Sequence, residues 1–553
     1  MAAAARESVS NRCMPERSTT LSDSGHSIRE LYLCGVIALY LLVGIFLLRF
    51  FRYWINPDAT SYISIAMKYL RGDVWQAVNG LWGPLLSWLL MPFMALGASP
   101  ALGAKALSLC IGVFAITSIY CLSRRFEISD SQRLLLLLFL LPMFLFFTLF
   151  DFTPDLLLAS FLAFYLYALL DRDYPRSERQ GVTCGIFATL AYLSKAYAMP
   201  FFIVHFALCN ALVYIKGGHQ TRRLVLRSCL LGYAVFLAIS GIWVGCMSAK
   251  YGRLTFGSAG KYNYERMGFA EKGLPEISKR FLVPPNETAT HAWEDPVYIH
   301  LRSWSPLQSM QAFKYQIDMV RKTAVLSIAA YNWFSIFSIA ILALVLVNLC
   351  TKAGESIVAQ RTDLFSMLTI GIYNCGFLPL GILQERYMLI SAFLLVLLGT
   401  QLIAVGQRGK HLSEKRKISI LMLFLVSFSV MPAQALKRHA NDGKSAYLMS
   451  VRLTGEYHIK GNIASNANYS DMLQVAFWTG NRYFGVLDDT IPGPQLLDTL
   501  RTHNIAYYFV WSASNTRLNL PRYVESTLSG VPDLRIYALQ APDPRARTIP
   551  DSQ

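Results

Sequence analysis

The chain has 553 residues, of which 54% are hydrophobic and only 15% are charged, and its formal net charge is +17. A soluble domain usually carries about 25% charged residues, so this composition excludes an ordinary soluble protein and indicates a chain that lies largely in a bilayer. The positive residues are spread through short segments between apolar runs, which disfavours a nucleic-acid-binding domain and favours contact with anionic lipid. All 10 cysteines precede residue 376, in the polar N-terminus or the apolar runs, so no disulfide framework is predicted.

Residues 1–30 are polar and are predicted to form a cytoplasmic tail, because the first apolar run begins too late for an ordinary cleaved signal peptide. That run is therefore expected to be a retained anchor. About eleven apolar runs approach the length that crosses a hydrocarbon core of ~30 Å. The predicted spans are 31–51, 101–122, 134–150, 154–170, 181–194, 200–215, 228–248, 325–349, 364–383, 388–405 and 418–435.

The distribution of positive charge orients these spans. With the N-terminus in the cytoplasm, the short outer connections hold only Lys195 and Arg386, and the inner connections hold many more cations. The inner cations are Arg124, Arg125, Arg133, Arg172, Arg176, Arg179, Lys216, Arg222, Arg223, Arg227, Lys352, Arg361, Arg408, Lys410, Lys415, Arg416 and Lys417. By the positive-inside rule, we expect an integral protein of a bacterial plasma (inner) membrane whose C-terminal segment lies outside the cytoplasm.

The apolar run 82–96 decides this topology. Counting it as a span would invert every later segment and place the Arg-rich connections outside. Because the run is shorter than the ~17 residues that a spanning helix needs, we expect a re-entrant or interfacial helix.

Three segments are expected on the outer face: a loop at 52–83, a large loop at 249–322 and a C-terminal domain at 436–553. In the last of these, strand patterns alternate with helix patterns and predict a small α/β domain. The expected strands are 458–465, 482–487, 505–511 and 534–539, and the expected helices are 470–479 and 494–502. The predicted architecture is an all-α polytopic membrane domain at 31–435 followed by this small extracytoplasmic domain.

An amphipathic helix is predicted in the first outer loop, directly after Asp58. Its apolar face holds Tyr62, Ile65, Ala66 and Tyr69, and its polar face holds Ser61, Ser64, Lys68 and Arg71. Such a helix is typical of a membrane surface. Asp58 can be the N-cap of the helix, or a general base that takes a proton from an attacking hydroxyl, and the two roles are compatible.

A second acidic position lies in the turn Asp151-Phe152-Thr153-Pro154-Asp155. Asp155 can simply complement the dipole of the next helix, or it can add a second carboxylate to the Asp58 site. Together Asp58 and Asp155 could hold a divalent cation or position a substrate without metal. Two carboxylates alone are weak evidence for a metal site, so a cation is no more than a possible cofactor.

Lys195 and Arg386 are either snorkelling side chains at helix ends or ligands of an anion such as a phosphate, for which Lys offers a point charge and Arg a fork. Residues expected to make secondary contacts with substrate or lipid are Tyr62, Asn79, Trp82 and Tyr387. No zinc-type spacing is present, and His205 is predicted to be a buried interhelical histidine rather than a ligand.

Taken in chain order, five short elements resemble the membrane glycosyltransferases of the C-type fold, in particular family 39, the protein O-mannosyltransferases and the lipid A aminoarabinose transferases. They are Asp58 before the Ser61-Tyr62 helix, Trp82-Gly83-Pro84-Leu85-Leu86-Ser87-Trp88, Thr153-Pro154-Asp155, Leu193-Ser194-Lys195 and Glu385-Arg386-Tyr387. The resemblance covers residues 31 to about 435. It implies an inverting transfer of a sugar from a polyprenyl-phosphate donor, with Asp58 as the catalytic carboxylate. Ala59 stands where the commonest version of the motif has a second acidic residue.

On these grounds Asp58 is expected to be the base, Asp155 to support it, and Lys195 and Arg386 to hold the donor phosphate. The expected partners are a polyprenyl-phosphate-linked sugar, membrane lipids and an extracytoplasmic acceptor, which could be a glycolipid, a polysaccharide or a protein. The alternative is a non-enzymatic transporter, flippase or assembly partner for lipid-linked sugars. A transporter places its polar residues near the middle of the membrane, whereas these four map to outer helix ends, so the enzyme is favoured.

Overall fold

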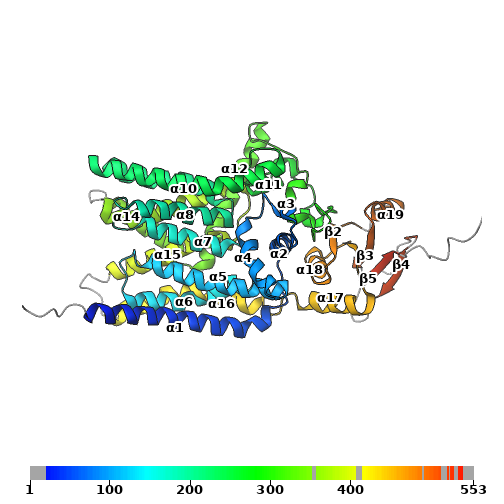
Figure 1. Cartoon of the computed structure of the whole chain (residues 1–553), viewed down its shortest axis with the longest axis horizontal. Coiled ribbons are helices and arrows are strands. Elements are labelled where there is room, and N and C mark those ends of the chain that lie inside the picture. Colours follow the sequence, from blue (N-terminus) through cyan, green and yellow to red (C-terminus); the bar gives the residue numbers. More distant parts are fainter. Residues whose placement is uncertain are drawn as a thin grey trace, which may run out of the picture.

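The computed structural model describes residues 20–351, 357–406, 414–488, 491–511, 520–521, 523–527 and 534–539. Figure 1 shows a bundle of long helices with a small sheet and its flanking helices at one end. Residues 1–19 of the predicted tail lie outside the described residues, as do Lys352, Arg408 and Lys410 of the predicted inner connections. Residues 20–30 already belong to the first helix of the bundle.

Within the described ranges, eight helices are long and apolar enough to cross a membrane, or nine if one bent pair is a single span. The α-helices that form most of these eight candidate spans are α1 (Thr20–Phe51), α5 (Pro100–Ser123), α6 (Asp130–Leu149), α9 (Ala198–Lys216), α10 (His219–Tyr251), α14 (Ile357–Cys375), α15 (Leu389–Gly406) and α16 (Glu414–Arg438). The chain is thus an integral membrane protein of the predicted all-helical kind.

Two predicted spans, 154–170 and 181–194, form helices that are too short to be counted among these eight. They are α7 (Asp155–Leu169) and α8 (Glu178–Ser194), which pack against each other inside the bundle. The α8 helix approaches α10 closely, since a Cβ atom added at Gly181 or Gly185 would lie 2.4 Å from a carbonyl oxygen of α10. Small residues four apart allow such backbone contact between membrane helices.

The predicted span 325–349 is not one continuous helix, although the bent pair that covers it is together long and apolar enough to be a single span. Instead α12 (Met310–Phe334) and α13 (Ser338–Thr351) meet at an angle of 102°. Ser335 at the break has an extended backbone (φ −161°), and its hydroxyl accepts the N–H of Phe337 at 3.2 Å. The Ser338 hydroxyl donates to the Tyr331 carbonyl at 2.8 Å. Serine hydroxyls thus replace the lost helical hydrogen bonds, which is a known cause of helix breaks.

At the end of the bundle that carries the sheet, three short helices cover the ends of the long ones. These are α2 (Pro57–Leu70), α3 (Val74–Ala77) and α4 (Pro84–Ala95). The α4 helix comes from the predicted re-entrant run and is a short apolar helix of 12 residues. The α2 helix differs from the prediction, because its polar face is covered: Ser61, Ser64 and Lys68 are all buried beneath the large loop.

The C-terminal segment forms the predicted α/β domain, with one strand and one helix more than expected. Its elements are α17 (Lys444–Tyr457), β1 (Asn462–Ser465), α18 (Tyr469–Thr479), β2 (Arg482–Val486), α19 (Gly493–Thr502), β3 (Ile505–Trp511), β4 (Tyr523–Thr527) and β5 (Leu534–Leu539). The sheet order is β2-β1-β3-β5-β4, in which β1 is parallel to β2 and β3, while β5 is antiparallel to β3 and β4. The first strand begins later than predicted because His458 ends α17 with a φ of 46°. Separate apolar clusters pack around this sheet.

The large loop between α10 and α12 joins the edge of this sheet. It contains α11 (Ala259–Arg266) and four short 3-10 helices, η1 (Phe269–Glu271), η2 (Ile277–Lys279), η3 (Ala292–Glu294) and η4 (Pro296–Tyr298). The β2 backbone bonds to the loop on both sides of Gly485, through Leu282 N–H to the Phe484 carbonyl (2.7 Å) and Val486 N–H to the Arg280 carbonyl (3.1 Å). Further along, the Tyr483 N–H donates to the Thr290 carbonyl at 2.7 Å. The loop therefore ties the α/β domain to the end of the bundle and covers an exposed strand edge.

Candidate active site

Four charged side chains from distant parts of the chain meet at the end of the bundle that carries the sheet. The guanidinium of Arg386 donates to Asp58 Oδ2 at 2.7 Å, and its Nε lies 3.8 Å from Asp155 Oδ2. The Lys195 ammonium donates to the other oxygen of Asp155 at 2.5 Å. These are the four residues that the sequence singled out, and the structure brings them into one continuous chain of ion pairs.

Helix ends place the two acids. Pro57 is the first residue of α2 and Asp58 the second, while Asn56 is the N-cap, so the interpretation of Asp58 as an N-cap is wrong. The Asn56 side chain instead accepts the Phe152 N–H at 3.2 Å, which ties the segment before α2 to the turn before α7. Asp155 is the first residue of α7, where a carboxylate also interacts favourably with the helix dipole.

Two further elements place the cations. Lys195 follows the last residue of α8, and its ammonium lies 4.0 Å from the centre of the Tyr387 ring, which favours a cation. Arg386 belongs to η6 (Glu385–Met388), and its Nε donates to Gln384 Oε1 at 2.8 Å. Each cation thus has a carboxylate partner and a second contact that holds its side chain in place.

The four side chains are partly buried, so their charges interact strongly while some of them stay accessible. The side chain of Asp155 is 4% exposed and that of Arg386 13%, whereas Asp58 and Lys195 are 19% and 23% exposed. Ion pairs at such depth are little screened by salt. The two more accessible side chains, Asp58 and Lys195, line the cavities described below.

A third acid, Asp151, lies half-buried in the same turn. Burial raises the pKa of its carboxyl to about 6, an effect that Arg386 opposes and that the negative charges of Asp58 and Asp155 reinforce. Asp151 therefore changes its charge near neutral pH, next to the four-residue cluster.

Three cavities meet at this cluster. A cavity of about 920 Å³, mostly apolar, is lined by Lys195 and Tyr387 together with residues of α9, α11 and α14. A second, of about 560 Å³, contains Asp58, Trp293 and Tyr469 along with several basic residues of the large loop. A third, of about 480 Å³, contains Asp58, Asp151 and Arg386 and extends to α12 and α16. Asp58 thus lies between two cavities, and Lys195 opens onto the apolar one.

The residues predicted as secondary contacts have different surroundings. Tyr387 lies against Lys195 in the apolar cavity, as expected for a contact residue. Tyr62 and Trp82 are buried and pack edge to face, with ring centres 5.1 Å apart. Asn79 is buried, and its amide accepts the N–H groups of Leu81 and Trp82 and donates to the Glu294 carbonyl, so it shapes a loop.

Trp293 was not singled out by the sequence. Its indole N–H donates to Asp58 Oδ1 at 3.4 Å, and its ring lines the cavity of about 560 Å³. The large loop offered no periodic pattern or motif that marks this tryptophan, because its role depends on a contact between residues 235 positions apart.

The predicted metal alternative does not fit the donor set. In the part of the chain that the structure describes, no group of three or more His, Cys, Asp or Glu side chains could hold an ion. Asp58 and Asp155 each bind a cationic side chain instead. His205 is buried between helices, where its ring nitrogens contact Tyr165 (2.8 Å) and Thr369 (2.9 Å), in agreement with the prediction.

Comparison with known proteins agrees with this arrangement. Residues 82–243 match the family described as dolichyl-phosphate-mannose-protein mannosyltransferase, while no curated protein sequence matches the chain. Among solved structures, the chain is similar to ArnT from Cupriavidus metallidurans bound to undecaprenyl phosphate. That match has a TM-score of 0.56 and 14% identity, and covers 92% of this chain and 98% of ArnT. The chain has the C-type glycosyltransferase fold.

Two more structures support the C-type fold. ArnT of the same organism in the apo state gives a TM-score of 0.53 at 14% identity, over 92% of this chain and 98% of the other. The Archaeoglobus fulgidus oligosaccharyltransferase in its apo form gives 0.51 at 12% identity, over 86% of this chain and 69% of the other. Since identities are this low, the likeness extends to the architecture of the bundle and its C-terminal domain. What the site does must be argued from its own residues.

Proposed function

We propose that the protein is an inverting glycosyltransferase that moves a sugar from a polyprenyl-phosphate donor to an acceptor outside the cytoplasm. One observation carries the proposal: two carboxylates and two cationic side chains form a cluster where an apolar cavity meets two more polar ones. A phosphate on a lipid chain needs cations beside an apolar groove, and an acceptor hydroxyl needs a carboxylate. The match to the mannosyltransferase family over residues 82–243 supports the same chemistry.

The apolar cavity is the proposed site of the polyprenyl chain. Aromatic and aliphatic side chains line most of it, and Lys195 and Tyr387 are part of its lining. A donor with its chain in this cavity brings its phosphate to Lys195 and, beyond it, to Arg386. The structurally similar ArnT from Cupriavidus metallidurans binds undecaprenyl phosphate, a lipid of this class, which supports the assignment.

Phosphate binding prepares the base in this proposal. Without a donor, Asp58 accepts a 2.7 Å hydrogen bond from Arg386, so one of its carboxylate oxygens is occupied by that cation. A phosphate that takes over Lys195 and Arg386 leaves Asp58 free to accept the acceptor's proton. The acceptor oxygen then attacks the anomeric carbon, the bond from that carbon to the phosphate oxygen breaks, and polyprenyl phosphate leaves with the electron pair, stabilised by both cations.

The acceptor is proposed to enter through the cavities on the Asp58 side. Both contain Asp58, and one is walled by the large loop and by Tyr469 of the C-terminal domain. With the Arg-rich connections in the cytoplasm, this end of the bundle faces the outside of a bacterial plasma membrane. A transporter of lipid-linked sugars is disfavoured, because the cluster lies at the ends of α2, α7 and α8 rather than midway along the spans.

The test is transfer from polyprenyl-phosphate sugars by protein reconstituted in nanodiscs, followed by mass spectrometry of co-purifying lipids and products. Asp58→Asn should lower kcat by about a thousandfold while donor binding persists, because the base is lost but both cations stay. Asp318→Asn, at an exposed position of α12, is the matched control. Full activity of folded Asp58→Asn protein would reject the base assignment.

A further inference from the structure

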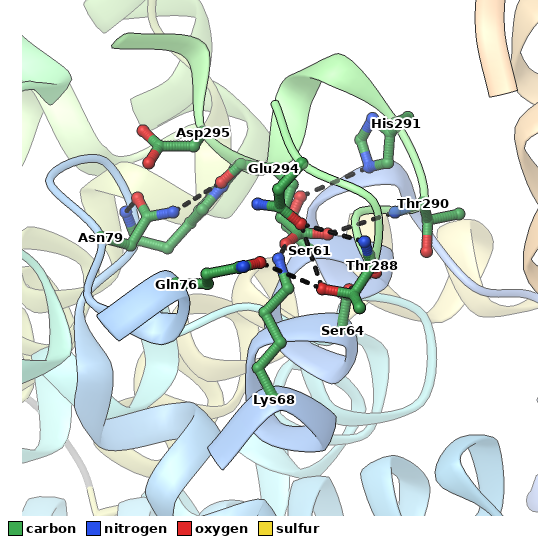
Figure 2. Close-up of polar contacts among 12 residues, drawn as sticks. Ser61, Ser64, Lys68, Gln76, Asn79, Thr288, Thr290, His291, Glu294 and Asp295 are labelled. Atoms are coloured by element: carbon green, nitrogen blue, oxygen red, sulfur yellow. Dashed lines mark hydrogen bonds and ion pairs between the residues drawn. The ribbon is translucent and has the colours of Figure 1, made fainter. Parts of the chain in front are cut away.

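A short segment of the large loop, residues 288–295, lies in a polar pocket against α2 and is held there from several sides. Figure 2 shows Glu294 of this segment beside Lys68 at the centre, with Ser61 and Ser64 of α2 close to them. The ammonium of Lys68 donates to Glu294 Oε1, and the two side chains are only 1% and 2% exposed. The polar face of α2 therefore forms a buried ion pair with the loop and does not face solvent.

Every oxygen of Glu294 has a partner. The Thr290 N–H donates to Glu294 Oε2 at 3.3 Å, and the Asn79 amide donates to its backbone carbonyl at 2.6 Å. A buried pair of opposite charges gives little net stability compared with apolar residues of the same size. It does restrict the relative positions of the two segments, because each charged group must stay next to its hydrogen-bond partners. The Lys68–Glu294 pair thus fixes the position of the loop on α2.

The residues on both sides of this pair are anchored too. Asp295 binds the Lys250 ammonium at 3.2 Å and the Tyr251 hydroxyl at 3.0 Å, both at the end of α10. The Thr60 hydroxyl donates its proton to the Pro57 carbonyl at 2.7 Å. His291 Nε2, 2.8 Å from the same hydroxyl oxygen, is therefore the donor of that second hydrogen bond. Burial lowers the pKa of His291 to about 3, which keeps the ring neutral.

These anchors determine where Trp293 lies. Its carbonyl accepts the Trp82 indole N–H at 3.1 Å, and its ring meets those of Trp82 and Tyr262 edge to face. Its indole N–H contacts Asp58 Oδ1 at 3.4 Å, opposite the oxygen that Arg386 holds. The ring is half-buried and forms part of the wall of the cavity that contains Asp58. An aromatic face in such a place suits the apolar C–H face of a sugar ring.

We propose that Trp293 contacts substrate and orients the Asp58 carboxylate, and that the buried Lys68–Glu294 pair is the positioning device that holds Trp293 in place. The inference rests on the proposed function and deepens it, since it adds a residue of the large loop to the site. It also gives a reason for the large loop to cover the polar face of α2. The contacts between loop and helix hold Asp58 and Trp293 in a fixed position relative to each other.

The first experiment separates the two parts of Trp293. Trp293→Phe removes the N–H but keeps an aromatic ring, and should lower kcat at least fivefold with little change in the KM for donor. Trp293→Ala also removes the ring, and should lower kcat/KM for acceptor at least fiftyfold. Both variants should melt within about 2 °C of the wild type, because the ring is only half-buried. Transfer within twofold of the wild type by both variants would overturn the role of Trp293.

The second experiment tests the positioning pair. Lys68→Met leaves Glu294 without its cation and should lower both the melting temperature and kcat. The double variant Lys68→Met/Glu294→Gln buries no unpaired charge, so it should recover the melting temperature but keep a kcat at least tenfold below the wild type. Recovery of kcat along with stability would show a merely structural pair. The control is Arg125→Met, which breaks the Arg125–Asp171 pair and should lower stability alone. Asp171 comes just after the end of α7, whose first residue is Asp155, so this pair lies at the far end of that helix from the cluster.

Hydrogen exchange gives a readout that does not depend on transfer. Amides of residues 288–295 should exchange at least tenfold faster in Lys68→Met than in the wild type, and unchanged exchange would overturn the anchoring role. Asp58→Asn measured in parallel separates the two proposals. If Asp58→Asn loses transfer while the Trp293 variants keep it, the function stands and this inference fails. If Asp58→Asn keeps transfer, the proposed function itself fails.

Discussion

Arg386 is the residue whose replacement tests the site most directly, because its side chain contacts both Asp58 and Asp155. Its guanidinium has a 2.7 Å bond to Asp58 and lies 3.8 Å from Asp155, with 13% of the side chain exposed. Arg386→Met removes this charge from the leaving phosphate, which should raise the barrier by about 3–4 kcal/mol and lower kcat/KM by roughly 10²–10³-fold. Arg386→Lys keeps the charge but loses the fork, and should cost about tenfold.

The assay is kcat/KM for a polyprenyl-phosphate sugar in nanodiscs, together with thermal unfolding of each variant. Arg386→Met should also melt at a lower temperature, since Asp58 then has no cation within salt-bridge distance among the described residues. Arg253→Met, at an exposed arginine just after α10, controls for the loss of a positive charge from this end of the bundle. If folded Arg386→Met protein transfers sugar within threefold of the wild type, the reasoning about the phosphate is refuted.

Three further predictions concern other parts of the site. In the wild type, the raised pKa of Asp151 contributes stability that is full below about pH 4 and is lost as the pH rises through about 6. Asp151→Asn should remove this pH-dependent loss of about 1–3 kcal/mol in the free energy of unfolding. Thermal unfolding measured against pH tests this, and an unchanged profile would contradict it. Val204→Trp, in the wall of the apolar cavity, should raise the KM for long-chain donors about tenfold and that for short-chain analogues much less, through lost apolar contact; equal effects on both donors would argue against a lipid site there. Gly485 has a φ of 88°, and a Cβ there would lie 2.4 Å from the Arg280 carbonyl oxygen, so Gly485→Ala should destabilise the protein by about 2–3 kcal/mol and loosen the loop; a normal melting curve would show that the loop can shift at no cost.

The order of the membrane helices and the four charged residues of the cluster could be predicted from the sequence. Apolar runs report burial in lipid directly, because each span satisfies its own backbone hydrogen bonds and needs only length and hydropathy to be seen. Asp58, Asp155, Lys195 and Arg386 stood out for the same reason, since charges are rare at helix ends between apolar runs. Strands such as β3 and β5 were found at their observed ends, because their patterns of apolar residues are local.

Other features depended on contacts between distant residues and could be seen only in the tertiary structure. The break between α12 and α13 is stabilised by serine hydroxyls whose use hydropathy does not reveal. The polar face of α2 was expected at a membrane surface, but Lys68 finds Glu294 more than 200 residues away and is buried instead. Trp293 contacts Asp58 from a loop that this pair, Asp295 and His291 anchor to distant helices. Local periodicity determines which segments are helices, whereas the partner of a buried charge is a property of the folded chain.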